Sequence, residues 1–173
     1  MLPDLLVPDL LAIFVGTSAS TTSAAREHYY SHHTNRFWDL LEATGLTDAA
    51  GLTSERDREI TMHGVGLTDL VKGRAASSDA LLADSDYDAA GLIMRLAAVK
   101  PRSVAFNGKE AAKRVAAHLG VRLAVIGPTG WEVAGAPAYW LPSSSATNSR
   151  MTAGEKRAHW CAFGNWARAL PQD

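Results

Sequence analysis

Polar side chains gather in three stretches of the chain, and each stretch follows a short apolar run. The first is GTSASTTSAAREHYYSHHTN at residues 16–35, the second starts with Asn107-Gly108, and the third is PSSSATNS at residues 142–149. Hydroxyl, amide and imidazole groups donate and accept hydrogen bonds, and long loops rich in such residues commonly carry function. These three stretches are therefore the candidates for a functional site.

The histidines of the first stretch do not predict a metal site. His28, His32 and His33 are close in sequence, but no cysteine pair or acidic residue stands at ligand spacing to them. The chain also lacks a phosphate-binding G-x-x-x-x-G-K-[ST] loop and a nucleophile elbow. We expect no metal and no other cofactor.

Apolar periodicity predicts the elements that position these stretches. Short apolar runs favour strands at residues 10–15, 103–106, 123–126 and 138–141. Helical spacing predicts helices from Phe37 to a stop at Gly45, at 88–99 behind a Ser85/Asp88 cap, at 110–119, and from Thr152, which forms a capping box with Glu155. Residues 53–60 indicate a short surface helix, and residues 64–70 a turn that returns to the core.

Strands that alternate with helices predict an α/β fold in a single domain, residues 1–173. We expect three layers, with a central four-stranded, mainly parallel sheet flanked by helices on both faces. Ligands of such folds bind beyond the carboxyl ends of the strands. Here that edge carries the loops after Val15, Phe106 and Leu141, which are the three polar stretches.

The totals are those of an ordinary globular domain. The chain has 173 residues and a net charge of −1, so any surface for nucleic acid must be a local basic patch. The single cysteine, Cys161, cannot form an intrachain disulfide, and Asp4 and Asp9 interrupt an N-terminal segment that superficially resembles a signal peptide. We expect a cytoplasmic protein that makes no use of a membrane.

Four blocks of the chain resemble motifs of the uracil-DNA glycosylase superfamily. GTSAS at 16–20, SAA at 23–25, HYY at 28–30 and NRFW at 35–38 together resemble its first active-site motif. GVGLTDLV at 64–71, VAFNGK at 104–109 and LPSSSA at 141–146 resemble the next block, the middle strand and the second active-site motif. The closest branch is that of the mismatch-specific uracil and thymine DNA glycosylases. One block alone is weak evidence, but four in order at the strand ends form a fairly specific pattern.

Ser18 departs from that branch, which has an asparagine there to position the attacking water. The stretch YYSHHTNRFW at 29–38 is also similar to the YYxHPxNxFW pattern of the hypoxanthine-DNA glycosylase branch, with His33 in place of proline. In that branch the asparagine before x-F-W is implicated in catalysis, and here it is Asn35. The chain combines features of both branches, so a uracil-directed and a hypoxanthine-directed enzyme both remain open.

The resemblance implies hydrolysis of the bond between a damaged base and its sugar, after the base has been turned out of the duplex. The candidates for catalysis are Asn35, Ser18 and Asp69, whose carboxylate would activate water or stabilise the cationic sugar. Asn35 equally suits a helix cap. The expected contacts to the base are Thr17 through its backbone, Tyr30 by stacking, His28 and Asn107.

The resemblance also implies a surface that contacts DNA. Its expected residues are Lys109, Ser143, Ser144, Ser145, Thr147, Asn148 and Arg150. Thr147 is small, so Asn148 or Arg150 is expected to fill the gap left by the flipped base. The implied partner is double-stranded DNA with uracil or another deaminated base, bound by a monomer on the bacterial nucleoid. A binder of damaged DNA without catalysis is the alternative from another class.

Overall fold

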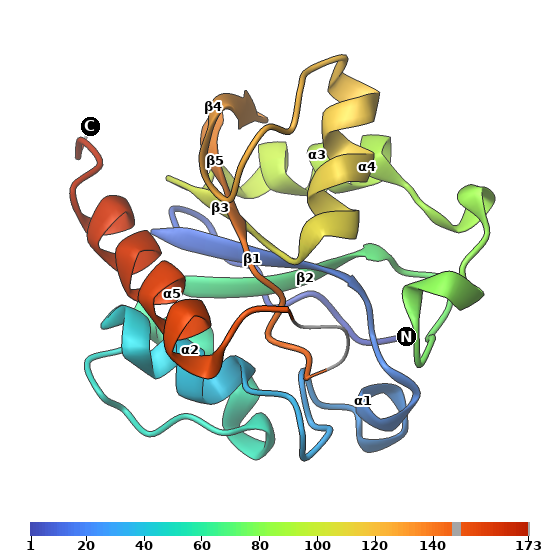
Figure 1. The fold of residues 1–173 in the computed structure, drawn as a ribbon, viewed down its shortest axis with the longest axis horizontal. Helices are drawn as coiled ribbons and strands as arrows, with labels where there is room; N and C mark the ends of the chain where they lie inside the picture. Colours follow the sequence, from blue (N-terminus) through green and yellow to red (C-terminus); the bar gives the residue numbers. More distant parts are fainter. Residues whose placement is uncertain (147–149, 173) are drawn as a thin grey trace.

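A five-stranded sheet with strand order β2-β1-β3-β5-β4 forms the centre of the protein (Figure 1). The computed structural model describes residues 1–146 and 150–172. β2, β1, β3 and β5 pair in parallel, and β4 is the antiparallel partner of β5 at one edge. The strands are β1 (Ala12–Ser18), β2 (Val65–Val71), β3 (Val104–Asn107), β4 (Gly127–Val133) and β5 (Ala136–Leu141).

Helices cover both faces of this sheet (Figure 1). The longer ones are α2 (Phe37–Thr44), α3 (Ala89–Val99), α4 (Lys109–Leu119) and α5 (Ala153–Arg168). The shorter ones are α1 (Thr21–Arg26) and the 3-10 helices η1 (Ser54–His63), η2 (Asp79–Leu81) and η3 (Asp84–Asp86). No helix in the described part of the chain combines the length and the apolar composition needed to cross a bilayer.

The alternation of side chains along β1 explains why helices are needed on both faces. Ala12 and Phe14 belong to an apolar cluster that includes residues of α2 and α5. Ile13 and Val15 belong to a second cluster, with residues of α3 and α4. Successive side chains of a strand point to opposite faces, so a strand that is apolar at every position must be covered twice.

The predicted α/β class, the mostly parallel sheet and the helices on both faces are confirmed. The sheet has five strands instead of four, because the predicted turn at residues 64–70 is strand β2, whose seven residues are all buried. Gly66 is needed there, since a Cβ would lie 2.8 Å from the carbonyl oxygen of Leu5, which crosses over the strand. The predicted strand at 123–126 is wrong: those residues form no strand, and β4 begins at Gly127.

The helix caps follow the predictions closely. Thr152 and Glu155 form the expected capping box of α5, with the Thr152 side chain accepting from the Glu155 amide at 3.1 Å. At α3 the cap is Asp88 itself, whose carboxylate accepts from the Gly91 amide at 2.8 Å, and Ser85 lies outside the helix. The capping residues fix where these helices begin.

Gly164 on α5 offers a test of how closely α5 packs on α2. A Cβ at this buried position would collide with the carbonyl oxygen of Thr44 at the end of α2. We expect Gly164→Ala to lower the free energy of unfolding by about 1–3 kcal/mol, since the two backbones would have to separate. Urea unfolding of the variant and the wild type measures this change.

Gly154→Ala is the matched control, because Gly154 lies on the same helix with open space around its Cβ position. It should be neutral or stabilise the protein by up to about 1 kcal/mol through helix propensity. Equal effects of the two substitutions would contradict the close contact between α5 and α2.

Candidate functional site

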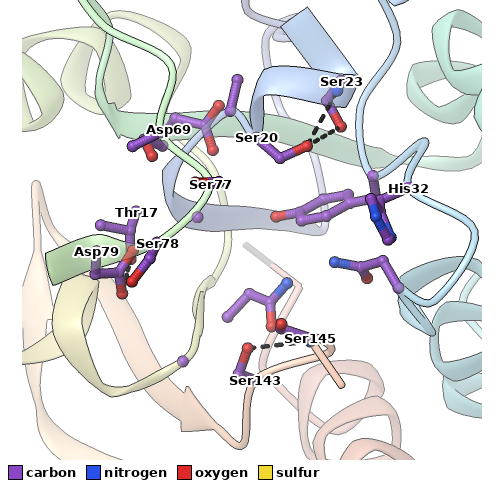
Figure 2. Close-up of a pocket in the computed structure, with 18 of the residues that line it drawn as sticks. Thr17, Ser20, Ser23, His32, Asp69, Ser77, Ser78, Asp79, Ser143 and Ser145 are labelled. Atoms are coloured by element: carbon purple, nitrogen blue, oxygen red, sulfur yellow. Dashed lines mark hydrogen bonds between the residues drawn. The ribbon is translucent and has the colours of Figure 1, made fainter. Parts of the chain in front are cut away.

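A cavity of about 650 Å³ opens at the carboxyl ends of β1 and β3 (Figure 2). β3 pairs with β1 only as far as Val15, while β1 continues beside β2 to Ser18. The side of β1 that faced β3 is therefore open from Gly16 onward. This is where the strand order reverses, the position at which open α/β sheets bind ligands.

The three polar stretches predicted to form the site all contribute to the wall of this cavity. The wall includes residues 16–23, 107–110 and 143–145, with further residues from the segment 29–35. One part of the wall was missed by the sequence analysis, namely residues 76–80. There Asp79 accepts a long hydrogen bond from the Thr17 hydroxyl at 3.5 Å, and both lie at the same side of the pocket (Figure 2).

Gly16 lets two polar oxygens pack closely on the backbone of β1. A Cβ at this position would lie 2.5 Å from Oδ1 of Asp69 and 3.0 Å from the hydroxyl of Tyr30. Asp69 is the residue of β2 that pairs with Gly16, so their side chains point to the same face of the sheet. The absence of a side chain at Gly16 is what allows both oxygens to lie this close to β1.

The Asp69 carboxyl is the most perturbed acid of the pocket. Its residue is only 3% exposed. Burial disfavours the charged form and raises the pKa of Asp69 to about 7, with Lys72 and Arg95 opposing the rise and Asp4 adding to it. Near neutral pH the group is therefore present both protonated and ionised, as suits a group that exchanges protons.

Tyr30 is held in an unusual conformation against the pocket. Its φ of 51° lies in the left-handed region, which costs a non-glycine residue about 1 kcal/mol or more. One face of its ring stacks on Phe37, with centroids 4.0 Å apart. Its hydroxyl is buried beside the Asn107 side chain. Burial and the charge of Asp69 raise the pKa of Tyr30, and Asn107 opposes this rise.

Asn35 lines the pocket but also supports the start of α2. Its side-chain oxygen accepts from the backbone amide of Phe37 at 3.0 Å. The amide nitrogen, which can only donate, remains for the pocket. This arrangement favours a role in binding an acceptor atom over a role in taking a proton. Ser18, the last residue of β1, also lines the pocket and is half-buried.

Asn107 ties β3 to the loop that follows β5. Its amide nitrogen donates to the Ser144 hydroxyl at 2.9 Å, and its oxygen accepts from the Ser144 amide at 2.8 Å. The Ser144 carbonyl in turn accepts from the Arg36 amide at 3.0 Å. Asn107 therefore positions this loop, and its side chain also interacts with the Tyr30 hydroxyl.

The same loop is anchored from α5. The indole nitrogen of Trp160 donates to the Pro142 carbonyl at 3.0 Å, and the buried Lys156 ammonium donates to the Ser145 carbonyl at 3.1 Å. Ser143 lies at the pocket, where its hydroxyl accepts from the Ser145 amide (Figure 2). Five hydrogen bonds, from Asn107 on β3, from Arg36 at the start of α2 and from α5, thus hold residues 142–145 in place.

His28 does not lie where the sequence analysis predicted. It is absent from the pocket wall, and its Nδ1 lies 3.0 Å from Oδ1 of the buried Asp57. The other oxygen of Asp57 accepts from the Tyr29 amide at 2.8 Å. The His28–Asp57 pair therefore supports the loop that presents Tyr30, and the structure does not bring His28 together with the other predicted base contacts at the pocket wall. His32 does line the pocket, and its ring stacks on the exposed His33.

The predicted DNA contacts fall into three groups. Lys109 is exposed on the first turn of α4 at the pocket, next to the serines of residues 143–145. Arg150 lies apart, in a shallow groove with Glu155 and His159. Thr147 and Asn148 fall outside the described residues. Within the described ranges, no three His, Cys, Asp or Glu side chains come together in a way that could hold a metal ion.

The fold and the pocket together define a ligand-binding α/β domain with a titratable carboxyl beside the ligand space. The family model of the uracil DNA glycosylase superfamily matches residues 3–164. The chain therefore belongs to the uracil DNA glycosylase superfamily.

Two individual proteins illustrate the relationship. The chain is 29% identical over 92 residues to the G/U mismatch-specific uracil DNA glycosylase of Schizosaccharomyces pombe, a match that covers 53% of this chain and 28% of that protein. The solution NMR structure of a candidate uracil DNA glycosylase from Methanosarcina acetivorans superposes with a TM-score of 0.63, at 23% identity and over 96% of both chains. The second comparison supports the fold over nearly the whole chain.

The raised pKa of Asp69 predicts how stability depends on pH. An unfolded carboxyl titrates near 3.8 and the folded one near 7, so between these values the folded state binds more protons than the unfolded state. This group therefore destabilises the fold increasingly as the pH rises through that window, and the effect levels off above it. We expect Asp69→Asn to be more stable than the wild type at about pH 8, by up to roughly 4 kcal/mol.

Urea unfolding at a series of pH values measures the difference, which should shrink toward about pH 4. Glu42→Gln, on the exposed side of α2, is the control for the loss of one negative charge. A gap between Asp69→Asn and the wild type that stays constant from acid to alkaline pH would contradict the buried, pKa-shifted carboxyl.

Proposed function

We propose that the protein is a DNA glycosylase that hydrolyses the bond between uracil and deoxyribose in DNA, and leaves an abasic site. The observation that carries the proposal is the buried Asp69 carboxyl, which titrates near neutral pH in the pocket of a chain from this superfamily. The printed function of the Schizosaccharomyces pombe relative supports uracil as the base. We propose duplex DNA as the partner and a monomer as the acting species.

Asp69 is the proposed water-activating group. As the bond between N1 of the base and C1′ of the sugar breaks, the bonding electrons leave with the base and the sugar becomes cationic. A water oxygen bonds to C1′ and gives a proton to the Asp69 carboxylate, and the departing base takes a proton from solvent. The place proposed for this water is the edge of the pocket beside Gly16, where the Asp69 carboxyl and the Tyr30 hydroxyl both lie against β1.

The base is proposed to lie in the pocket against Tyr30. Phe37 supports one face of the Tyr30 ring, so a base stacked in the pocket would extend an existing aromatic stack. Donors for the base oxygens, which gain negative charge in the reaction, are the amide nitrogens of Asn35 and Asn107 and the backbone of the open edge at Thr17. Fixed donors at developing charge are an effective means of lowering a barrier.

The DNA strand is proposed to cross the loop at residues 143–145. This loop is pinned by Asn107 and by α5, so its hydroxyl and amide groups are fixed beside the pocket. Small hydroxyl residues allow phosphates to approach closely, and Lys109 offers a cation next to them. Because this loop is already fixed, it would lose little conformational entropy when the DNA strand binds to it.

Base release from a labelled duplex tests the proposal. The substrate carries one U:G pair, or hypoxanthine at the same position, under single-turnover conditions. We expect uracil release that falls by about 100-fold or more in Asp69→Asn, the range for losing a general base. Ser18→Ala and Asn35→Ala, run alongside, should fall less, because neither side chain takes the proton in this account.

Other outcomes of the same experiment point to other functions. Release of hypoxanthine alone would make the protein a hypoxanthine-directed glycosylase, which the similarity around Asn35 favours. Retention of damaged duplex over undamaged duplex, without release of either base, would make it a lesion binder. Uracil release that collapses in Ser18→Ala or Asn35→Ala but survives in Asp69→Asn would move catalysis away from Asp69.

Gly16→Ala tests the positions of Asp69 and Tyr30 without removing a polar group. The new methyl group would lie 2.5 Å from Asp69 Oδ1 and 3.0 Å from the Tyr30 hydroxyl, so it would displace both. A displacement of about 1 Å at a reacting group can cost about 100-fold in rate, and we expect a loss of that order. Single-turnover uracil release measures it.

Gly73→Ala is the control, since Gly73 follows β2 with open space at its Cβ position. It should keep the wild-type rate. A Gly16→Ala protein that folds and releases uracil at the wild-type rate would contradict a role for the close packing of Asp69 and Tyr30 on Gly16.

A further inference from the structure

The segment before β1 pairs with β2 close to the pocket. Leu5 pairs antiparallel with Leu67 of β2 through two backbone hydrogen bonds, of 2.9 and 3.0 Å. Leu2 is buried and forms part of the pocket wall. Between these two anchors the segment carries one carboxylate, that of Asp4.

Asp4 binds two cations that come from different elements. Its Oδ1 accepts from the Lys72 ammonium and from the Thr68 hydroxyl, both at 2.7 Å. Its Oδ2 forms an ion pair with Nε of Arg95 on α3 at 3.0 Å. The Asp4 and Lys72 side chains are each 19% exposed, so solvent screens this cluster only in part.

The same two cations are neighbours of Asp69. Nη2 of Arg95 donates to the backbone carbonyl of Asp69 at 2.9 Å, and Lys72 follows three residues later, directly after β2. Their charges favour the ionised carboxyl of Asp69, whereas the charge of Asp4 opposes it. The charged and titratable groups that interact with Asp69 are Lys72 after β2, Asp4 on the segment before β1, Arg95 on α3, and the hydroxyls of Tyr29 and Tyr30 on the loop before α2.

We propose that Asp4 is a positioning residue for Asp69: it holds Lys72 and Arg95, so that neither cation pairs with the carboxyl that takes the proton from water. The inference rests on the proposed function, in which Asp69 is the water-activating group. A cation close to a carboxylate stabilises the ionised form and makes it a weaker base. With both cations engaged by Asp4, Asp69 keeps its affinity for a proton, and the pocket keeps a base that works near neutral pH.

Asp4→Asn is the variant that tests this role, because the amide oxygen still accepts from Thr68 and Lys72 while the charge is lost. The measurement is the pH profile of single-turnover uracil release. We expect the acid limb of the profile to move to lower pH by about half a unit to one unit. At the acid end the variant would then be about three- to tenfold faster than the wild type.

Lys72→Met is the opposing variant, since it removes a charge that favours the ionised Asp69. Its acid limb should move to higher pH. Loss of packing alone would lower the rate at every pH. It would not move the midpoints of the Asp4→Asn and Lys72→Met profiles in opposite directions. Glu59→Gln, which breaks an exposed ion pair with Arg56 outside the pocket wall, is the control and should leave the midpoint in place.

The effect of Asp4 on Asp69 can also be measured in an experiment that does not depend on catalysis. The ¹³C signal of the Asp69 carboxyl, assigned by its absence in Asp69→Asn, reports the titration directly in the free protein. An unchanged midpoint of this signal in Asp4→Asn overturns the inference, whatever the rates are. Uracil release that persists in Asp69→Asn instead overturns the proposed function, so the two failures are distinguishable.

Discussion

The site depends on one constraint, the point at which β1 and β3 stop pairing. Because β3 pairs with β1 only as far as Val15, the last residues of β1 have one covered side and one open side. The open side becomes a wall of the pocket, and the covered side keeps Gly16 in register with Asp69 on β2. A single feature of the sheet thus creates the cavity and brings a carboxyl to its edge.

The proposed role of Asp69 would account for the serine at position 18. A strand holds its side chains more precisely than a loop does, and β2 is buried along its whole length. Ser18 offers a shorter reach than the asparagine of the mismatch-specific branch, but a carboxyl one strand away can face the same region of the pocket. Burial raises the pKa of that carboxyl, and its Oδ1 and the Tyr30 hydroxyl both lie against Gly16.

Local patterns predicted the class of the fold well, and long-range contacts account for what was missed. Helix caps and apolar periodicity depend on residues that are close together in the sequence, so the helices and most strands could be predicted. The sequence of β2 resembles a turn because Gly66 and Asp69 interrupt its apolar run. The burial of these residues depends on Leu5, which is distant in the sequence and pairs with Leu67 of β2. His28 was placed at the base because a loop sequence does not say which way a side chain points, and its partner Asp57 lies on another element.

The most direct test of the account is the structure of Asp69→Asn bound to a duplex with one U:G pair. The account predicts a uracil turned out of the helix and held in the pocket against Tyr30. C1′ of its sugar should face residue 69 at the edge of the pocket beside Gly16. A uracil that stays stacked in the duplex would contradict the account. So would a flipped uracil whose C1′ faces Ser18 or Asn35, with residue 69 out of reach of any water beside it.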